Sequence, residues 1–422
     1  MILPLAKLQP GMHIARDVSN LNGMVLLTAG TALTAHHLRV LNIWGVQGVH
    51  VADQGDRPAE PPITPALRQV AENYVNHRLR YATDSPSFAV WKELAVRRTA
   101  NRWADQPPSV GVPHGSKAPQ SGEATPPTWP VAAVPATRHR AASNARDFVR
   151  QSAGLPSLPS LYYELVRNIH NGDASVNTVC GIIRKDHGLV ARLLRLANSV
   201  FYGLPLEVDS PEDAVQIIGF NEVQNLVLAT SIIKAFDKMA SDQMDAPSFW
   251  LHSIACATAS SMLAEQWYDP LPERFFVGGL LHDSGRLLML LNAPEQSREI
   301  LRRCQAETAL AMEIEQQVLG FDHVVLGAEL ASYWKLPDSL WEMVRCHHNP
   351  AAAIGHPKDA FFISYADFIA SVLEFGKSGE LFPYPLLVQP EHEPFLLDEE
   401  QIPLVASELE TQCAQLFSIF TS

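Results

Sequence analysis

The chain has 422 residues, which is more than a single hydrophobic core usually serves, so its length predicts at least two domains. Its formal net charge of −13 at pH 7 argues against nucleic acid as the main ligand, because phosphate recognition needs clustered Lys and Arg side chains. It has five cysteines but no CxxC pair, no signal-peptide pattern and no apolar run of bilayer length. We therefore expect a cytoplasmic protein with reduced thiols and no membrane span.

The first quarter of the chain predicts a small domain followed by a connector. Residues 1–53 are typical of a β-rich domain: HIARDV and MVLL have the composition of strands, Asn22-Gly23 between them suits a tight hairpin, and GVQGVHVAD supplies a last strand. Residues 54–103 have a helical composition and form the predicted connector. Residues 104–147 are rich in proline, serine and alanine without a hydrophobic period, so we expect a flexible linker.

The remainder of the chain is typical of helices. From 148 to 376, apolar residues recur at three- and four-residue spacing, which predicts one all-α domain. One of its helices has clear end signals, with Ser210 as N-cap, Pro211 in the first position and Gly219 after the end. Residues 377–422 predict an acidic loop and a C-terminal helix. The predicted fold class is mainly α, an all-helical domain preceded by a small β-rich one.

Two ionisable residues stand in a strongly apolar run. His282 and Asp283 lie within GGLLHDSGRLLMLL, residues 278–291, which is otherwise typical of a buried helix. Burying two such groups is costly unless something pairs with them. A divalent metal would offset that cost, and so would an ion pair with Arg286 or a satisfied hydrogen bond in the core.

Further residues able to bind a metal lie on, or at the ends of, the predicted helices. The full set is His252, His282, Asp283, His323, His347, His348 and Asp367. A helical bundle can direct such side chains into one interior site, and histidine with carboxylate suits Fe, Mn or Zn. We predict one or two divalent ions, with Asp283 able to bridge them. For each histidine taken alone, the alternative is a core or capping residue with satisfied hydrogen bonds.

Several stretches carry a family resemblance. RLANSVFYGLP, residues 195–205, is followed by AVQIIGFNEVQNL, residues 214–226, and this succession is close to diagnostic of one family. LPSLP, NGDAS, GGLLHDSGRLLM, GFDHVVLGAELASYWKLP and VRCHHNP also match it. From about Leu155 to Asp367 the chain therefore resembles the HDOD branch, the HD-related output domain, of the HD superfamily of metal-dependent phosphohydrolases.

The resemblance implies roles for particular residues. The metal set of HD hydrolases is matched by His252, His282-Asp283 and Asp367. The additional histidines of HD-GYP relatives are matched in order by His323, His347 and His348. In an active enzyme, Asp283 and Arg286 would be the catalytic residues, acting with metal-activated water. Residues 1–53 resemble the small domain attached to HD-GYP phosphodiesterases of cyclic di-GMP.

The chain departs from the HD-GYP pattern in three places. Arg286 stands where that pattern has lysine, and Ser248 stands where some relatives have glutamate. HHNPAAAIGHP replaces the HHE…GYP stretch. The guanidinium fork and the lysine point charge suit different phosphate geometries. These departures argue against cyclic di-GMP turnover.

Three functions stay open at this point. We favour a bacterial-type regulatory protein that acts without catalysis, through protein partners in a signalling pathway, and that retains a metal site. The first alternative is a metal-dependent phosphohydrolase, a phosphodiesterase with a cyclic dinucleotide or nucleotide as its ligand. The second is a di-iron redox or oxygen sensor.

Overall fold

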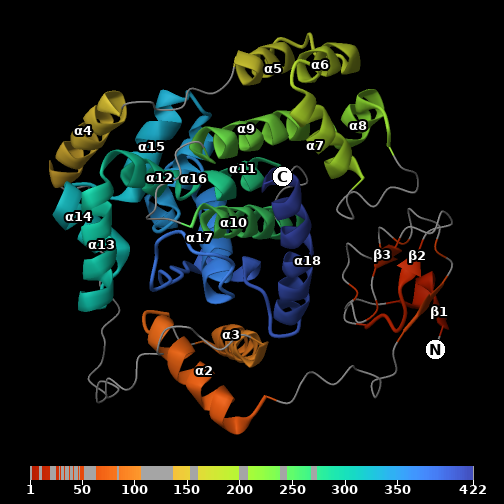
Figure 1. Cartoon of the computed structure of the whole chain (residues 1–422), viewed down its shortest axis with the longest axis horizontal. Coiled ribbons are helices and arrows are strands. Elements are labelled where there is room, and N and C mark those ends of the chain that lie inside the picture. The colour runs from red at the N-terminus through yellow and green to blue at the C-terminus, as the bar shows by residue number, and fades with distance from the viewer. Residues whose placement is uncertain are drawn as a thin grey trace. The chain divides into compact units, whose positions relative to one another are not determined.

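The computed structural model is built mainly of helices, which confirms the predicted fold class (Figure 1). It describes residues 2–8, 12–19 and 25–27, the single residues 29, 33, 38, 41 and 46, and residues 48–51, 63–82, 85–105, 136–152, 160–198, 208–237, 245–267 and 273–421. The chain forms two compact units. The first unit comprises residues 1–60, 156–235 and 397–422, and the second comprises residues 61–155 and 236–396. No helix among the described residues is long and apolar enough to cross a bilayer.

The N-terminal part of the first unit consists of short antiparallel strand pairs. The strands are β1 (Ile2–Pro4) with β4 (Gly48–His50), and β2 (Val18–Ser19) with β3 (Val25–Leu27). A short 3-10 helix, η1 (Leu5–Lys7), follows β1. Their buried side chains, among them Ile14, Leu33 and Val49, form one small cluster. The Asn22-Gly23 turn predicted between β2 and β3 lies outside the described residues.

Six helices complete the first unit among the residues that the structure describes: α5 (Ser160–His170), α6 (Val176–Ile183), α7 (His187–Ala197), α8 (Pro211–Ile218), α9 (Phe220–Asp237) and α18 (Gln401–Thr421). The end signals of α8 act as the sequence predicts. The Ser210 side chain accepts a hydrogen bond from the Asp213 backbone, Pro211 opens the helix, and Gly219 ends it at a φ of 86°. Helix α18 packs against α7 although about two hundred residues separate them.

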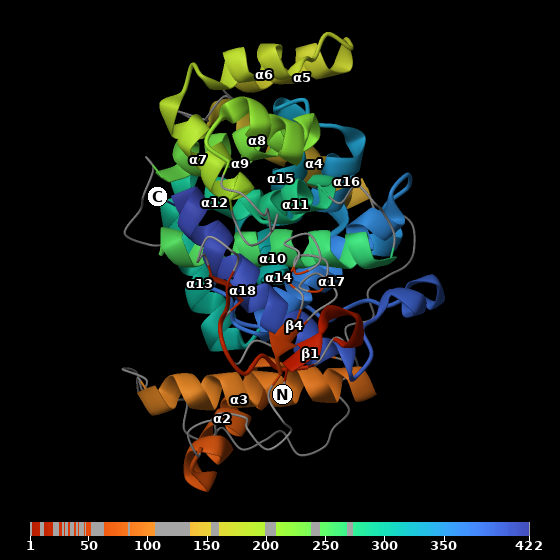
Figure 2. The same ribbon diagram turned by 90° about the vertical axis from the view of Figure 1, so that its right-hand side faces the viewer.

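The second unit is a helical bundle, and its described helices are α2 (Pro65–Arg78), α3 (Pro86–Asp105), α4 (Ala136–Gln151), α10 (Ala246–Trp267), α11 (Glu273–Leu281), α12 (Ser284–Asn292), α13 (Pro294–Glu307), α14 (Ala311–Leu319), α15 (His323–Tyr333), α16 (Asp338–Cys346) and α17 (Pro357–Val372). Two short 3-10 helices are η2 (Pro350–Ala352) and η3 (Pro390–Phe395). Helix α10 packs on both α11 and α17, and α2 pairs with α3, which also contacts α17 (Figure 2).

Two glycines let the central helices approach closely. A Cβ atom on Gly279 would lie 2.6 Å from the Cα of Ala257, so only glycine allows α11 to lie this close to α10. A Cβ atom on Gly285 would overlap the carbonyl oxygen of His323, which brings α12 onto α15. Both contacts position the helix ends from which His282, Asp283 and His323 project.

The structure differs from the predicted linker at that linker's C-terminal end. Residues 106–135 lie outside the described residues, but α4 begins at Ala136 and packs on α15. Alanine and arginine favour helix, and this helix buries Ala145 and Val149. The Pro-rich composition that predicted the linker stops before these residues. The composition of residues 104–147 taken as a whole therefore did not reveal the helical spacing at its C-terminal end.

Candidate metal centre

The structure brings all seven predicted ligands together in the second unit. His252 lies in α10 and Asp367 in α17, while the others stand at helix ends. His282 follows α11, Asp283 precedes α12, His323 opens α15, and His347 and His348 follow α16 directly. Every one of these side chains is buried. Helix ends from distant parts of the sequence therefore meet in one interior cluster.

One group of donors joins α10, α11 and α17. The Nε2 of His252 lies 3.1 Å from Oδ1 of Asp367, and the Nε2 of His282 lies 3.7 Å from the same oxygen. All three donor atoms fit within 4.8 Å of one another. Spacings of this kind allow one ion to touch three ligands at about 2.0–2.2 Å.

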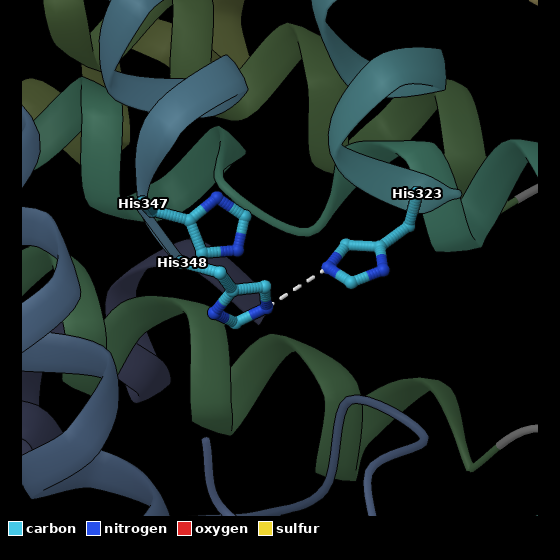
Figure 3. Close-up of side chains that lie close together, drawn as sticks. All are labelled: His323, His347 and His348. Carbon is cyan, nitrogen blue, oxygen red and sulfur yellow. Dashed lines mark hydrogen bonds between the residues drawn. The ribbon is translucent and has the colours of Figure 1, made fainter. Parts of the chain in front are cut away.

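A second group consists of three histidines. Figure 3 shows His323 facing His347 and His348 from the opposite side of the site, and the Nε2 atoms of His323 and His348 lie 3.1 Å apart. These three residues also offer donor atoms within 4.8 Å of one another. Burial lowers the pKa of His347 and of His348 well below the ordinary value, and the charge of a neighbouring histidine adds to the effect. Both rings are therefore neutral at pH 7, as metal ligation requires.

Asp283 lies between the two groups. Its Oδ2 is 3.4 Å from Nε2 of His282, in the first group. Its Oδ1 is 3.3 Å from Nε2 of His323 and 3.9 Å from Nε2 of His347, in the second group. Each oxygen of this one carboxylate thus faces a different set of histidines, which is the arrangement of a bridging ligand.

The polar atoms at the centre of the cluster lack hydrogen-bond partners among the described residues. They are Nε2 of His282 and His347. Nε2 of His252 and Oδ1 of Asp283 also make no hydrogen bond, but they lie 3.1 Å and 3.2 Å from Oδ1 of Asp367 and Nε of Arg286. A buried polar atom without a partner costs about 1–3 kcal/mol. A cation bound among these atoms would satisfy all of them at once, so the residues fit a metal.

Hydrogen bonds on the far side of the rings orient the histidines. Nδ1 of His282 donates to the Gly279 carbonyl at 2.6 Å, and Nδ1 of His347 donates to the Val344 carbonyl at 2.8 Å. In the neutral ring of His347, a proton on Nδ1 leaves the Nε2 lone pair directed at the site. Nδ1 of His323 lies 2.6 Å from Oε2 of the buried Glu315. Such outer contacts fix ligand orientation in metal sites.

Arg286 is buried beside the cluster and is surrounded by carboxylates. Its Nε lies 3.2 Å from Oδ1 of Asp283 and 3.8 Å from Oε1 of Glu315, and its Nη2 pairs with Glu380. Burial raises the pKa of Asp283, but Arg286 and His282 outweigh it and hold that pKa well below its ordinary value. The ion pair considered for Asp283 is therefore present in addition to the metal-type geometry.

Sequence reasoning missed three residues of this site. Glu315 supports His323, Glu380 approaches His348 with Oε1 3.5 Å from Nε2, and the Tyr384 ring stacks on the His348 ring at 3.7 Å. Glu380 and Tyr384 lie in the segment for which acidity predicted only a loop. No motif or helical period marks them, so the sequence offered no signal for their position.

A cavity of about 180 Å³ reaches the edge of the cluster. His252 and Glu380 line it, together with Lys377 and, from α2, Tyr74 and Arg78. Helices α2 and α3 are held there through Glu374, whose side chain is 10% exposed. This carboxylate accepts a hydrogen bond of 2.7 Å from the Tyr74 hydroxyl, and it pairs with Arg78 at 2.8 Å and with Arg102.

Part of the chain matches a known protein family. Residues 155–350 match the family model of the HDOD domain. A protein of Treponema pallidum (strain Nichols), described as uncharacterized, is 27% identical over 241 residues, covering 55% of this chain and 45% of that protein. The chain thus spans less than half the length of this relative.

Two solved structures share the helical fold. One is an HDOD domain protein of unknown function from Geobacter sulfurreducens, with a TM-score of 0.55 and 20% identity, covering 67% of this chain and 98% of that one. The other comes from Marinobacter aquaeolei VT8 and is described as a candidate signal transduction protein. It has a TM-score of 0.54 and 20% identity, covering 68% of this chain and 67% of that one.

Proposed function

We propose that this chain is a cytoplasmic signal-transduction protein that binds one or two divalent ions and acts through protein partners. The match of residues 155–350 to the HDOD family model supports the signalling role. The observation that carries the proposal is the position of Asp283, whose two oxygens face two separate histidine groups. The likeness of residues 1–53 to the small domain attached to HD-GYP phosphodiesterases of cyclic di-GMP belongs to the same proposal.

Each ion would have its own set of protein ligands. The first ion would be held by His252, His282 and Asp367. The second would be held by His323, His347 and His348, and Asp283 would contribute to both. Nitrogen with carboxylate oxygen suits Fe, Mn or Zn. Such ions supply Lewis acidity, and iron also supplies a redox state. The Nδ1 contacts of His282 and His347 keep their Nε2 atoms directed at the ions, so the bundle presents the ligands without rearrangement.

The surroundings of Arg286 favour regulation over hydrolysis. A phosphate-binding cation must be open to the substrate, but the Arg286 side chain is only 5% exposed. Its guanidinium is already shared among Asp283, Glu315 and Glu380. A phosphate ester would have to displace these internal carboxylates before Arg286 could stabilise charge in a transition state.

Hydrolysis of a phosphodiester remains the second candidate, and the complete donor set with the adjoining cavity favours it. The discriminating assay incubates protein loaded with Mn²⁺, Fe²⁺ or Zn²⁺ with a panel of cyclic dinucleotides and nucleotides. Metal-dependent product release that disappears in Asp283→Asn would establish an enzyme. The di-iron sensor would be distinguished by iron as the native metal and by a reversible spectral change on exposure to oxygen.

The proposal is tested by measuring the metal content of the purified protein by plasma mass spectrometry. We expect one or two equivalents in the wild type and a loss in both His282→Ala and Asp367→Ala. His356→Ala is the control, because this half-buried histidine lies in the same unit and pairs with Asp359 in the first turn of α17. Wild-type protein without metal after growth with added ions, or variants that keep full metal content, would contradict it.

A further inference from the structure

The segment that follows α17 carries a carboxylate into the cluster. The Glu380 side chain is only 6% exposed, and its Oε1 lies 3.5 Å from Nε2 of His348. Asp283, His323 and Glu380 offer one donor atom each within 4.8 Å of one another. Glu380 thus stands beside the second histidine group, although it is thirteen residues beyond Asp367 in the sequence.

One oxygen of Glu380 is left without a partner. Oε1 pairs with Arg286, whereas Oε2 is buried and has no hydrogen-bond partner among the described residues. The ion pair with Arg286 explains the position of Oε1, but it does not offset the desolvation cost of the buried Oε2. A cation held with Asp283 and His323, which each offer a donor atom within 4.8 Å of a Glu380 oxygen, would offset the charge of this carboxylate.

The backbone is shaped to deliver this side chain. Gly376 and Gly379 adopt positive φ values of 65° and 105°, which side-chain-bearing residues rarely take. A Cβ atom on Gly376 would also overlap the carbonyl of Ser248. The Lys377 backbone N–H donates to that same carbonyl at 3.1 Å. The segment is therefore fixed against α10 immediately before Glu380.

The other end of the segment is fixed as well. The Tyr384 ring stacks on His348, and the Tyr384 hydroxyl accepts a hydrogen bond of 2.6 Å from the Met312 backbone. Residues 376–384 are thus anchored on both sides of Glu380. An acidic loop that merely faced solvent would need neither anchor.

We propose, on the basis of the metal centre proposed above, that Glu380 is an additional metal ligand that closes the coordination of the second ion. Catalytic metal sites keep a position open for water or substrate, whereas structural sites fill every position with protein ligands. Glu380 takes the position that a small external anion would otherwise occupy. The centre is then saturated by the chain itself, in keeping with a regulatory role.

The test compares wild type with Glu380→Ala and Glu380→Gln. Glu380→Gln keeps a side chain of the same size and an oxygen for Arg286, so it guards against misfolding of the smaller variant. Glu391→Gln is the matched control, because Glu391 is an exposed carboxylate of the same loop region. The readouts are the rate of metal loss to a chelator and the binding of inorganic phosphate to metal-loaded protein by calorimetry.

We expect wild type and Glu391→Gln to hold both ions and to bind no phosphate. Both Glu380 variants should lose one equivalent at least about tenfold faster, and Glu380→Ala should gain phosphate binding. Unchanged metal loss and no phosphate binding in the variants would overturn the role of Glu380 while leaving the metal centre intact. Absence of metal from every protein, including wild type, would overturn the metal centre itself and this inference with it.

Discussion

The Nε of Arg286 lies 3.2 Å from Oδ1 of Asp283, the same carboxylate oxygen that faces His323 and His347. A cation of the protein thus supports the carboxylate that bridges the two donor groups. Breaking a buried ion pair by removing one partner costs about 3–5 kcal/mol. Arg286→Ala should therefore lower the free energy of unfolding by about that amount, as measured by urea denaturation.

The control for Arg286 is Arg302→Ala, which removes an exposed arginine paired with Glu299. Exposed pairs contribute little, so this variant should unfold close to wild type. A loss in Arg286→Ala no larger than in Arg302→Ala would show that Arg286 is not supporting the cluster. It would then be available for a substrate, which would favour the hydrolase.

Glu315 should control metal affinity without touching the metal. Its Oε2 lies 2.6 Å from Nδ1 of His323 and also accepts a hydrogen bond from the His323 backbone at 2.9 Å. Loss of such an outer contact typically weakens metal binding 10–100-fold. Glu315→Gln should raise the dissociation constant for Zn²⁺ or Mn²⁺ by roughly this factor in chelator competition. Glu313→Gln, an exposed change in the same helix, should leave it unaltered.

Close helix packing at Gly279 should be essential for the position of His282. Adding a methyl group there forces α11 away from α10, and overpacking of this kind costs about 1–3 kcal/mol. Gly279→Ala should lower both the unfolding free energy and the bound metal. Gly181→Ala in α6 meets no atom within 4 Å and should be neutral or slightly stabilising. Equal behaviour of the two variants would contradict the close approach of α10 and α11.

Glu374 should make the docking of α2 and α3 sensitive to acid. Burial raises its pKa, but Arg78 and Arg102 outweigh this, and the Tyr74 hydroxyl also favours the carboxylate, so its pKa in the folded protein lies below the ordinary value. Its stabilisation is therefore complete above the unfolded pKa of about 4.3 and is lost as the pH falls through the folded pKa.

The measurement for Glu374 is the unfolding free energy as a function of pH for wild type and Glu374→Gln. Wild type should be the more stable protein at neutral pH, and the difference should shrink as the pH falls below about 4. A difference that does not change with pH would mean that Glu374 contributes only by its shape. The carboxylate would then not anchor these helices.

The sequence predicted much of this structure because the local signals were strong. The caps of α8 and the apolar spacing of the other helices depend only on nearby residues, and the helices form where expected. The seven metal-type residues were recognisable because histidine and aspartate are unusual in apolar helices. Their convergence was not derivable from spacing, since it depends on which helix ends meet in three dimensions.

Other features depend on long-range packing and left no local signal. Helical periodicity from 148 to 376 gave no reason to divide the segment, yet residues 156–235 and 236–396 belong to different units. Glu380 reaches the cluster only because two glycines turn the backbone and α10 holds Lys377. An acidic, Pro-rich composition ordinarily indicates a solvated loop, and here it conceals a buried carboxylate.

Whether Asp283 bridges two ions can be measured by X-ray absorption spectroscopy of the metal-loaded protein. We expect about two equivalents of metal, ligation by nitrogen and oxygen, and a metal–metal scattering path of about 3.5–4 Å. Asp283→Asn should remove that path. A single ion without a metal–metal path in the fully loaded wild type would contradict the bridge.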